Sequence, residues 1–530
     1  MSRRLAVAAL GLLLGVARGA LGQQGAGLEQ WSTLSLPAAV VLSPLAPPPP
    51  QLLLLAPRRP VSLFWFVGNP GAVPGSVERS HSSYEFGSSR ETGAYRRPLD
   101  VPEASALTVS VMAWQPLGAH GAAVGRVALR DQGLDPGGLS HELNPYGSGP
   151  LISSDTTSPP VDRVRAVLEG AIGWRVGGWG IGAALAYDAT DNRTHATRLP
   201  RFGRSVQSGM TLGVVRWLGA GLQVGAHARY VDDVEEFSIL ALGANGTVYQ
   251  LLGLSEPFAI AVTSIQPYYR RFERHASAIG GGVSGRVFGA TWAAFWQSER
   301  RRERQTSDRA ALRQFDRWRA DATTWGVMAE RRLPWSGLVV RGGLRWTTLD
   351  GTAGIATLEG VINQRHETAL DLELSVRAGT ADSLWLAGLV LGASRREQRQ
   401  DDFLAQLAAS VASWSPGVTV ELAHRLGRST AVAGAVGYAG RYAVATIPNP
   451  AGKGAGYQAY VAPELGWSAT QATARTVTVV VRQRVRAATS VWLGLHYLTR
   501  SATGGTVPGG PEATARRTMT VLQLGALTGL

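Results

Sequence analysis

Long segments in which residues alternate strictly between two faces constrain this chain more than any other feature. Residues 179–188 put Trp, Ile, Ala, Leu and Tyr on one face and mainly Gly and Ala on the other. Segments 161–176, 222–230, 338–348 and 366–377 alternate in the same way, with Arg, Glu, Gln or Asp on the second face. A period of two residues is that of a β-strand. Soluble strands average about 5 to 6 residues, whereas a tilted membrane-spanning strand needs about 9 to 11. The lengths favour membrane strands over a soluble β-sandwich, which is the alternative.

Composition agrees with a barrel better than with helices. Glycine supplies 65 of the 530 residues and lies inside nearly every apolar run, although it costs about 1 kcal/mol relative to Ala within a helix. Charged residues are 17 % of the chain, where a soluble domain carries about 25 %. After the N-terminal region, no apolar run reaches the length of about 18 residues that a spanning helix needs. We therefore predict an all-β fold, a transmembrane antiparallel up-and-down β-barrel of about 18 strands (range about 16–20) with an irregular N-terminal segment.

The strand count comes from about twenty alternating segments, of which 209–217, 258–268 and 403–414 are weak. The other segments include 417–425 and 456–468, and Ser415–Pro416 is read as a short turn. Outer-membrane barrels use short periplasmic turns and long outer connections. Long connections are predicted near 132–160, 189–208, 231–257, 299–321 and 349–364. Aromatic residues near segment ends are expected to form girdles at the membrane interfaces, namely Trp174, Tyr187, Tyr230, Trp346 and Tyr497.

The N-terminus predicts export. Arg3 and Arg4 precede an apolar stretch, and Ala20-Leu21-Gly22 is a small-x-small cleavage site, so residues 1–22 are typical of a secretory signal peptide. We expect residues 23–100 to form a Pro-rich periplasmic or plug-like segment and 101–530 to form the barrel. The expected location is the cell outer membrane.

Short motifs carry a resemblance to known barrels. Residues 63–71, Leu-Phe-Trp-Phe-Val-Gly-Asn-Pro-Gly, resemble the Gly-Asn-Pro-Ala-type start of several barrel families, including fatty-acid-transporter-like barrels, with Gly71 in place of Ala. Residues 152–156 and 266–272 are similar to an uncharacterised outer-membrane barrel family. The resemblance implies an outer-membrane location, no known enzyme activity and no agreed substrate.

Catalytic and metal-binding motifs are not supported. The chain has no Cys, which excludes thiol catalysis and Cys-ligated zinc. His141-Glu142 is followed by Pro145 instead of completing His-Glu-x-x-His, Ser284 does not lie in Gly-x-Ser-x-Gly, and Lys453 lacks the P-loop spacing. We predict no enzyme, no metal and no cofactor, and keep an outer-membrane hydrolase as a third hypothesis.

Charged residues on the polar face are the candidate pore lining. Arg rings favour anionic solutes. The alternative is that arginines and carboxylates pair and fill the lumen as a polar core. Arg482, Arg484 and Arg486 recur on one face without an intervening acid. The candidates are Arg163, Arg165, Arg229, Arg341, Arg345, Arg482, Arg484, Arg486, Glu367, Asp371 and Glu373.

A basic stretch near 299–321 is the candidate outer-leaflet contact. Its arginines contribute to the net charge of +14 that the whole chain carries. Guanidinium groups bind phosphate. We expect Arg300, Arg301, Arg302, Arg304 and Trp318 to contact a phosphorylated glycolipid. A solvated loop, or a short helix with Arg at 309, 313 and 317, is the alternative.

The function that fits is passage or uptake of small solutes, with anions favoured. The alternative is a non-conducting scaffold barrel for a surface protein or receptor. Expected partners are outer-membrane lipid, lipopolysaccharide-type glycolipid and the barrel assembly machinery, because strand 518–530 resembles the C-terminal assembly signal apart from ending in Leu530. A surface or receptor protein is a further candidate partner. We do not expect the protein to bind nucleic acid.

Overall fold

A computed structural model gives the fold for most of the chain. It describes residues 61–64, 68–77, 79–97, 99, 101–135, 151–155, 160–194, 201–239, 246–263, 268–307, 313–333, 337–355, 360–379, 384–427, 429–486, 489–503, 510–512 and 514–529. The predicted signal peptide and most of the Pro-rich stretch lie outside these residues.

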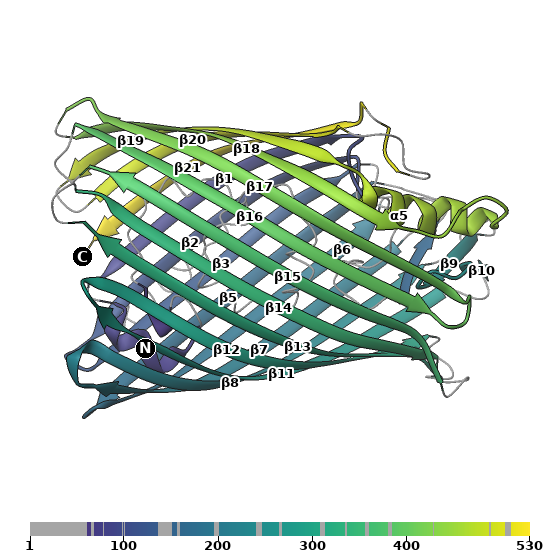
Figure 1. Ribbon diagram of the computed structural model, residues 1–530, viewed down its shortest axis with the longest axis horizontal. Helices are drawn as coiled ribbons and strands as arrows, with labels where there is room; N and C mark the ends of the chain where they lie inside the picture. Colours follow the sequence, from purple (N-terminus) through teal and green to yellow (C-terminus); the bar gives the residue numbers. More distant parts are fainter. Residues whose placement is uncertain are drawn as a thin grey trace, which may run out of the picture.

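Eighteen strands form one closed antiparallel barrel, as predicted (Figure 1). Each strand pairs with the barrel strands before and after it, and the last strand pairs with the first, from His81 opposite Gly529 to Gly93 opposite Arg517. Closure satisfies the backbone hydrogen bonds that lipid could not. The strands are β1 (His81–Gly93), β2 (Glu103–Leu117), β3 (Gly121–Leu134), β5 (Val161–Val176), β6 (Trp179–Thr194), β7 (Arg201–Leu218), β8 (Leu222–Ile239), β11 (Tyr268–Val287), β12 (Ala290–Ser307), β13 (Arg313–Arg332), β14 (Val339–Ile355), β15 (Gly360–Ala378), β16 (Trp385–Asp402), β17 (Leu407–Arg425), β18 (Thr430–Thr446), β19 (Ala472–Arg486), β20 (Thr489–Ala502) and β21 (Arg516–Gly529).

The two faces of the strands differ as lipid and lumen require. On β6, Leu185 on the outer face is 63 % exposed, whereas its neighbour Ala184 on the inner face is 3 % exposed. The predicted girdle residues are all exposed on the outer face, namely Trp174, Tyr187, Tyr230, Trp346 and Tyr497. An outward apolar band flanked by aromatic residues is the signature of an outer-membrane barrel. The protein is therefore an outer-membrane barrel.

The strands continue beyond the membrane at one end. The stretches expected to be long loops near 189–208, 231–257 and 299–321 are largely strand, because β6, β7, β8, β12 and β13 run into them. These projecting parts carry polar residues on both faces, so they lack the one-sided apolar pattern of a membrane strand. The longer connections lie at this end, which we assign as the outer end, and the short turns lie at the periplasmic end.

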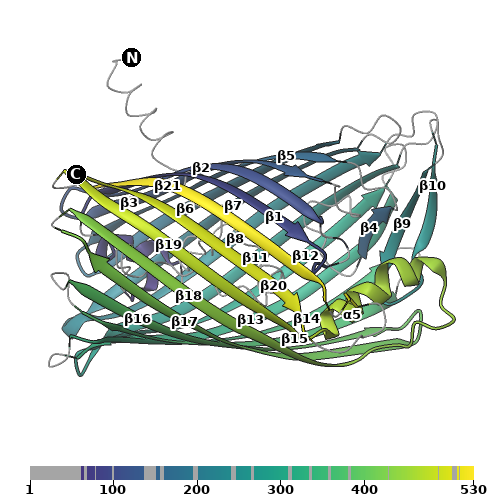
Figure 2. The same cartoon turned by 90° about the horizontal axis from the view of Figure 1, so that it is seen from above.

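Smaller elements gather at the outer end. The strands β4 (Leu151–Asp155), β9 (Gly246–Leu252) and β10 (Phe258–Val262) form a separate three-stranded sheet. A π-helix η3 (Tyr457–Val461) leads into α5 (Ala462–Ala469). Figure 2 shows this sheet and α5 at the end opposite the C-terminus. In the described parts of the chain, no helix is long and apolar enough to cross a membrane.

Two strand predictions and one turn prediction were wrong. Segment 258–268 lies partly in β10 outside the barrel. Segment 456–468 is helical, because buried Tyr457, Tyr460 and Val461 follow the i, i+3, i+4 spacing of a helix face.

The turn expected at Ser415–Pro416 does not exist, because β17 runs through it as one strand. Pro416 lies opposite Ala393 of β16, while the ladder to β18 is interrupted between Trp414 and Gly417. A proline has no N–H to donate to a ladder, so only one side of the strand loses its pairing.

The barrel begins at β1, before the expected boundary at residue 101. The sequence of β1 is mostly polar and gives little of the apolar alternation on which that boundary was placed.

Two 3₁₀-helices lie near the periplasmic end. They are η1 (Pro70–Gly75), which precedes the barrel, and η2 (Gly219–Gly221), which joins β7 to β8.

Candidate functional site

The N-terminal segment before β1 lies against the inner wall of the barrel. We call its described part, residues 61–64 and 68–77, the plug segment. It includes η1, which contacts β3, β5, β6, β7 and β8 and lies at the end of the barrel where β21 ends (Figure 1). The plug segment therefore occupies one side of the lumen at the periplasmic end.

Apolar side chains hold the plug segment in place. Leu63 and Phe64 are each 1 % exposed and Val73 is 0 % exposed. They share one hydrophobic cluster with inner-wall residues that include Val124 of β3 and Val215 of β7. Burial of each large apolar side chain contributes about 1.5 to 3 kcal/mol. The plug segment is thus firmly packed against the wall.

Five inward-facing glycines make room for the Asn69-Pro70-Gly71 turn. They lie on four consecutive strands. A Cβ added at Gly173 would come 2.7 Å from the Pro70 carbonyl oxygen, and one at Gly225 would come 2.8 Å from Asn69 Nδ2. At the other three the Cβ would come still closer to the plug segment. Any larger residue would displace the turn. The five are Gly173, Gly180, Gly182, Gly213 and Gly225, and we call them the glycine cradle.

Asn69 joins the plug segment to the backbone of two barrel strands. Its Nδ2 donates to the carbonyl of Val214, 3.2 Å away, and to that of Ala226, 3.0 Å away. Its Oδ1 accepts from the Gly71 N–H at 2.9 Å and so caps η1. A Cβ at residue 71 would lie 2.9 Å from the Gly213 carbonyl oxygen. A side chain at residue 71 would therefore push the turn away from β7.

Sequence reasoning missed Asn69 and the glycine cradle as parts of a site. Asn69 lies 145 and 157 residues away from its two backbone partners, so no local pattern connects them. The available signal was the clustering of Gly on the inner face between about residue 173 and residue 225.

Ten of the eleven pore-lining candidates lie on the inner face. They alternate with exposed apolar residues or pair across strands with inner-face neighbours. The ten are Arg163, Arg165, Arg229, Arg341, Arg345, Arg482, Arg484, Glu367, Asp371 and Glu373.

Arg486 departs from the expected shared face. A register shift between Arg484 and Arg486 places Arg486 opposite Thr489, whereas Arg484 lies opposite the inward Ser490. Since neighbouring strand residues face opposite sides, Arg486 does not continue the row formed by Arg482 and Arg484.

Several of the inner charges are paired. Arg165 forms an ion pair with Asp188, Arg229 pairs with Glu299 at 2.6 Å, and Glu367 pairs with Arg365. Arg163 Nε donates to Asn192 Oδ1 at 2.8 Å. On these parts of the wall the side chains form a connected polar lining.

Unlike the paired charges, Glu373 and Arg484 are both exposed on the inner face. Glu373 lies opposite Gly343 and Gly392, whose lack of side chains leaves the space around it open. These residues lie on β15 and β19, away from the strands that carry the plug segment. The described part of the lumen is therefore packed on one side and accessible on the other.

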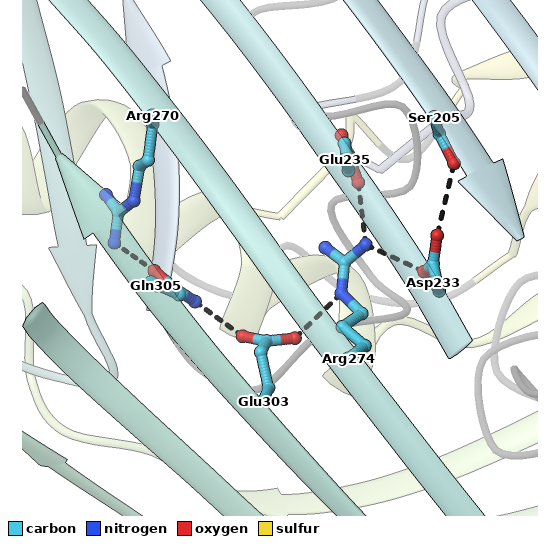
Figure 3. Close-up of polar contacts among 7 residues, drawn as sticks. All are labelled: Ser205, Asp233, Glu235, Arg270, Arg274, Glu303 and Gln305. Atoms are coloured by element: carbon cyan, nitrogen blue, oxygen red, sulfur yellow. Dashed lines mark hydrogen bonds and ion pairs between the residues drawn. The ribbon is translucent and has the colours of Figure 1, made fainter. Parts of the chain in front are cut away.

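A buried ion network crosslinks the projecting strands at the outer end. Arg274 of β11 contacts Asp233 at 3.1 Å and Glu235 at 2.8 Å on β8, and Glu303 at 2.9 Å on β12. Figure 3 shows its guanidinium between the three carboxylates. Arg270 reaches Glu303 through Gln305. Carboxylates buried this deeply require such a cation.

The helix α5 is fixed at the outer end by cations. Arg97, in the connection between β1 and β2, pairs with Glu464, and Arg441 of β18 donates to the Trp467 carbonyl at 3.3 Å. The Trp467 ring stacks with both guanidinium groups, at 5.3 and 4.8 Å from the ring centre. Burial raises the pKa of the neighbouring Tyr95.

Two of the expected glycolipid contacts lie on the wrong face. Arg301 points inward and pairs with Glu299, and Trp318 is only 7 % exposed in an inner cluster. Arg300, Arg302 and Arg304 are exposed on the outer face. The expected basic loop is a strand hairpin, in which neighbouring residues face opposite sides, so Arg301 and Trp318 cannot act together with Arg300, Arg302 and Arg304.

No group of three or more His, Cys, Asp or Glu side chains suited to a metal ion occurs among the described residues.

Comparisons with known proteins find structural likeness only. No protein-family model matches the chain, and no curated protein matches its sequence.

Similar solved structures include a siderophore receptor, PiuA of Acinetobacter baumannii, with 8 % identity, 84 % of this chain and 81 % of that chain covered, and a TM-score of 0.39. The copper transporter OprC has 9 % identity, coverages of 86 % and 82 %, and a TM-score of 0.40. The outer membrane transporter YddB of Escherichia coli has 7 % identity, coverages of 86 % and 81 %, and a TM-score of 0.37. The ligands in these names belong to those proteins.

Proposed function

We propose that this outer-membrane barrel conducts small solutes along the β14–β20 side of its lumen, past a plug segment docked on the opposite side. The observation that carries the proposal is the contrast between the two sides. Val73 of the plug segment is completely buried against the wall, while two charged residues of the inner face are exposed, Glu373 of β15 and Arg484 at the periplasmic end of β19. Barrels of 16 to 18 strands have room for an aqueous channel.

We further propose that the passage favours anions. Arg341, Arg345, Arg482 and Arg484 lie on the inner face of the conducting side. Glu367 and Asp371 are occupied by partners there, since Glu367 pairs with Arg365 and Asp371 accepts from Ser394 Oγ at 2.7 Å. Of these four arginines, Arg484 is exposed and Arg341 lies 3.9 Å from Glu330. Guanidinium groups on a pore wall lower the barrier for anions. Glu373, a carboxylate exposed on the same inner face, makes the preference moderate.

The reversal potential of single channels in a planar bilayer under a salt gradient tests this proposal. The wild-type protein should carry a steady anion-selective current. The double variant R482S/R484S should shift the reversal potential toward zero, while R475S, on the outer face of the same strand, should leave it unchanged. An unchanged potential in R482S/R484S would overturn the proposed lining.

The tight packing of the plug segment favours a second candidate, a non-conducting barrel that serves as a scaffold or receptor for another protein. A correctly folded barrel without current would support that candidate. Insertion of either kind of barrel would involve outer-membrane lipid and the assembly machinery as partners.

A further inference from the structure

A row of tryptophans marks the outer membrane boundary on one side of the barrel. Trp296 of β12, Trp325 of β13 and Trp346 of β14 lie directly opposite one another. The rings of Trp296 and Trp325 are 6.1 Å apart between centres. Tryptophan concentrates at the level of lipid headgroups, so residues further along these strands lie outside the hydrocarbon layer.

The outer face above this row changes from hydroxyl groups to arginines. Ser298, Thr323 and Thr348 form the next row, and Arg300 opposite Asp321 follows. Above them, Arg302 lies opposite Arg319 and Arg304 lies opposite Arg317. All five arginines are exposed. We call Arg300, Arg302, Arg304, Arg317 and Arg319 the outer arginine patch.

Two like-charged pairs face each other across this patch. Directly opposed like charges on one face of a sheet are destabilising. Arg300 has a carboxylate partner within the patch, since its Nε donates to Asp321 at 2.9 Å. Arg302, Arg304 and Arg319 have no carboxylate partner in the described part of the chain.

The acids around the patch are engaged by other bases. Glu273 lies directly opposite Arg304 in the sheet but pairs with Arg271 at 2.9 Å. Asp232 lies 2.6 Å from His275 Nδ1, and Asp350 lies 2.6 Å from His366 Nδ1. Arg302, Arg304 and Arg319 therefore present guanidinium groups that form no ion pair with these acids.

We infer that the outer arginine patch binds the phosphates of a phosphorylated glycolipid in the outer leaflet. Guanidinium groups bind phosphate through paired, charge-assisted hydrogen bonds. A lipid whose chains lie beside the tryptophan row would place its sugar against the hydroxyl row and its phosphates against the arginines. The site thus matches such a lipid from its chains to its charged groups.

The height of the patch selects a sugar-bearing lipid over a simple phospholipid. Arg302 is six residues above Trp296 on the same strand, which is about 15 Å above it at a rise of about 3.4 Å per residue and a tilt of about 40°. The headgroup layer of an ordinary bilayer is about 5 to 8 Å thick on each side. A larger headgroup is needed to bring phosphate to Arg302 and Arg319.

Equilibrium binding to the full-length protein in detergent micelles tests the inference. The probes are a bisphosphorylated disaccharide lipid, its dephosphorylated form, phosphatidylglycerol and a lipid-free phosphorylated polysaccharide, each radiolabelled. The variant R302Q/R304Q/R319Q removes the arginines without a carboxylate partner. The matched control R193Q/R395Q/R399Q removes three exposed arginines that pair with Asp191, Glu397 and Asp401 on their own strands.

Wild-type protein and the control should bind the bisphosphorylated lipid equally, and the patch variant should bind it about tenfold or more weakly. If the triple variant does not fold, as judged by heat-modifiable mobility, R302Q alone should still weaken binding. Equal binding by the patch variant would overturn the inference. Equal affinity for phosphatidylglycerol, for the dephosphorylated lipid or for a lipid-free phosphorylated polysaccharide would also overturn it. None of these outcomes depends on channel conductance.

Discussion

The side-chain nitrogen of Asn69 lies 3.0 Å from the backbone carbonyl oxygen of Ala226 and donates a hydrogen bond to it. Through this bond a turn that precedes every barrel strand is tied to β8. The same nitrogen donates to Val214 of β7. One amide therefore connects the plug segment to two adjacent strands.

Replacing Asn69 with Ala should release the plug segment without unfolding the barrel. The change removes both bonds to the wall and the cap of η1, a loss of about 1 to 3 kcal/mol in docking. The chain has no Cys, so a single Val73→Cys reports on docking by its rate of maleimide labelling. The rate should rise about tenfold or more in the N69A background.

The variant Arg79→Cys provides the control for that measurement, because Arg79 is exposed and lies outside the packed plug segment. A cysteine at this position should be labelled equally fast with and without the N69A change. Labelling of V73C at the same rate with and without the N69A change would contradict the role assigned to the amide.

Gly213→Ala should undock the plug segment by steric contact. Its Cβ would meet Asn69 Oδ1 and would lie 2.7 Å from Pro70 Cδ. Gly170→Ala is the matched control, because its Cβ would have no neighbour closer than 3.8 Å.

The same V73C labelling should accelerate with G213A and not with G170A. Since Asn69 and Gly213 act on one contact, the double variant N69A/G213A should add little to either single change. Full additivity would show that the two residues act separately.

Arg274→Met should destabilise the projecting outer end strongly. It leaves the carboxylates of Asp233, Glu235 and Glu303 without their shared cation, a loss of about 3 to 5 kcal/mol. Arg204→Met is the control, because Arg204 is 72 % exposed in its pair with Glu236 and such pairs contribute about 0 to 1 kcal/mol.

Limited proteolysis at the outer end should therefore be much faster in R274M than in R204M. Adding Glu235→Gln to R274M should restore part of the resistance by removing one buried charge. If R274M and R204M are cleaved at the same rate, the network does not hold the strands together.

The sequence predicted the membrane part of the barrel because lipid imposes a pattern on single residues. Leu372 and Leu374 had to be apolar, whatever lies across the lumen, and that alternation is visible locally. Beyond the membrane the strands need no apolar face, so the alternation disappears. Arg274 and Asp233 lie opposite each other on neighbouring strands, but in the sequence they are only two charged residues far apart. Trp318 was assigned to the surface because strand alternation was not expected there.

The docking of the plug segment on the barrel wall could not be predicted from the sequence, for a different reason. The fit of Asn69 to Gly213 depends on residues far apart in the chain, and each is uninformative alone. The inner-face position of Glu373 followed from alternation, whereas its exposure depends on the glycines of two neighbouring strands, Gly343 and Gly392.

Single-channel current through the Glu373→Cys variant tests the central claim most directly. A charged methanethiosulfonate reagent should reduce the current within single channels as it attaches to the introduced thiol, because the passage runs along β15. The same reagent should leave the current of V73C unchanged, because Val73 is buried. An E373C current that persists unaltered after complete labelling, or a folded barrel that never conducts, would contradict the account.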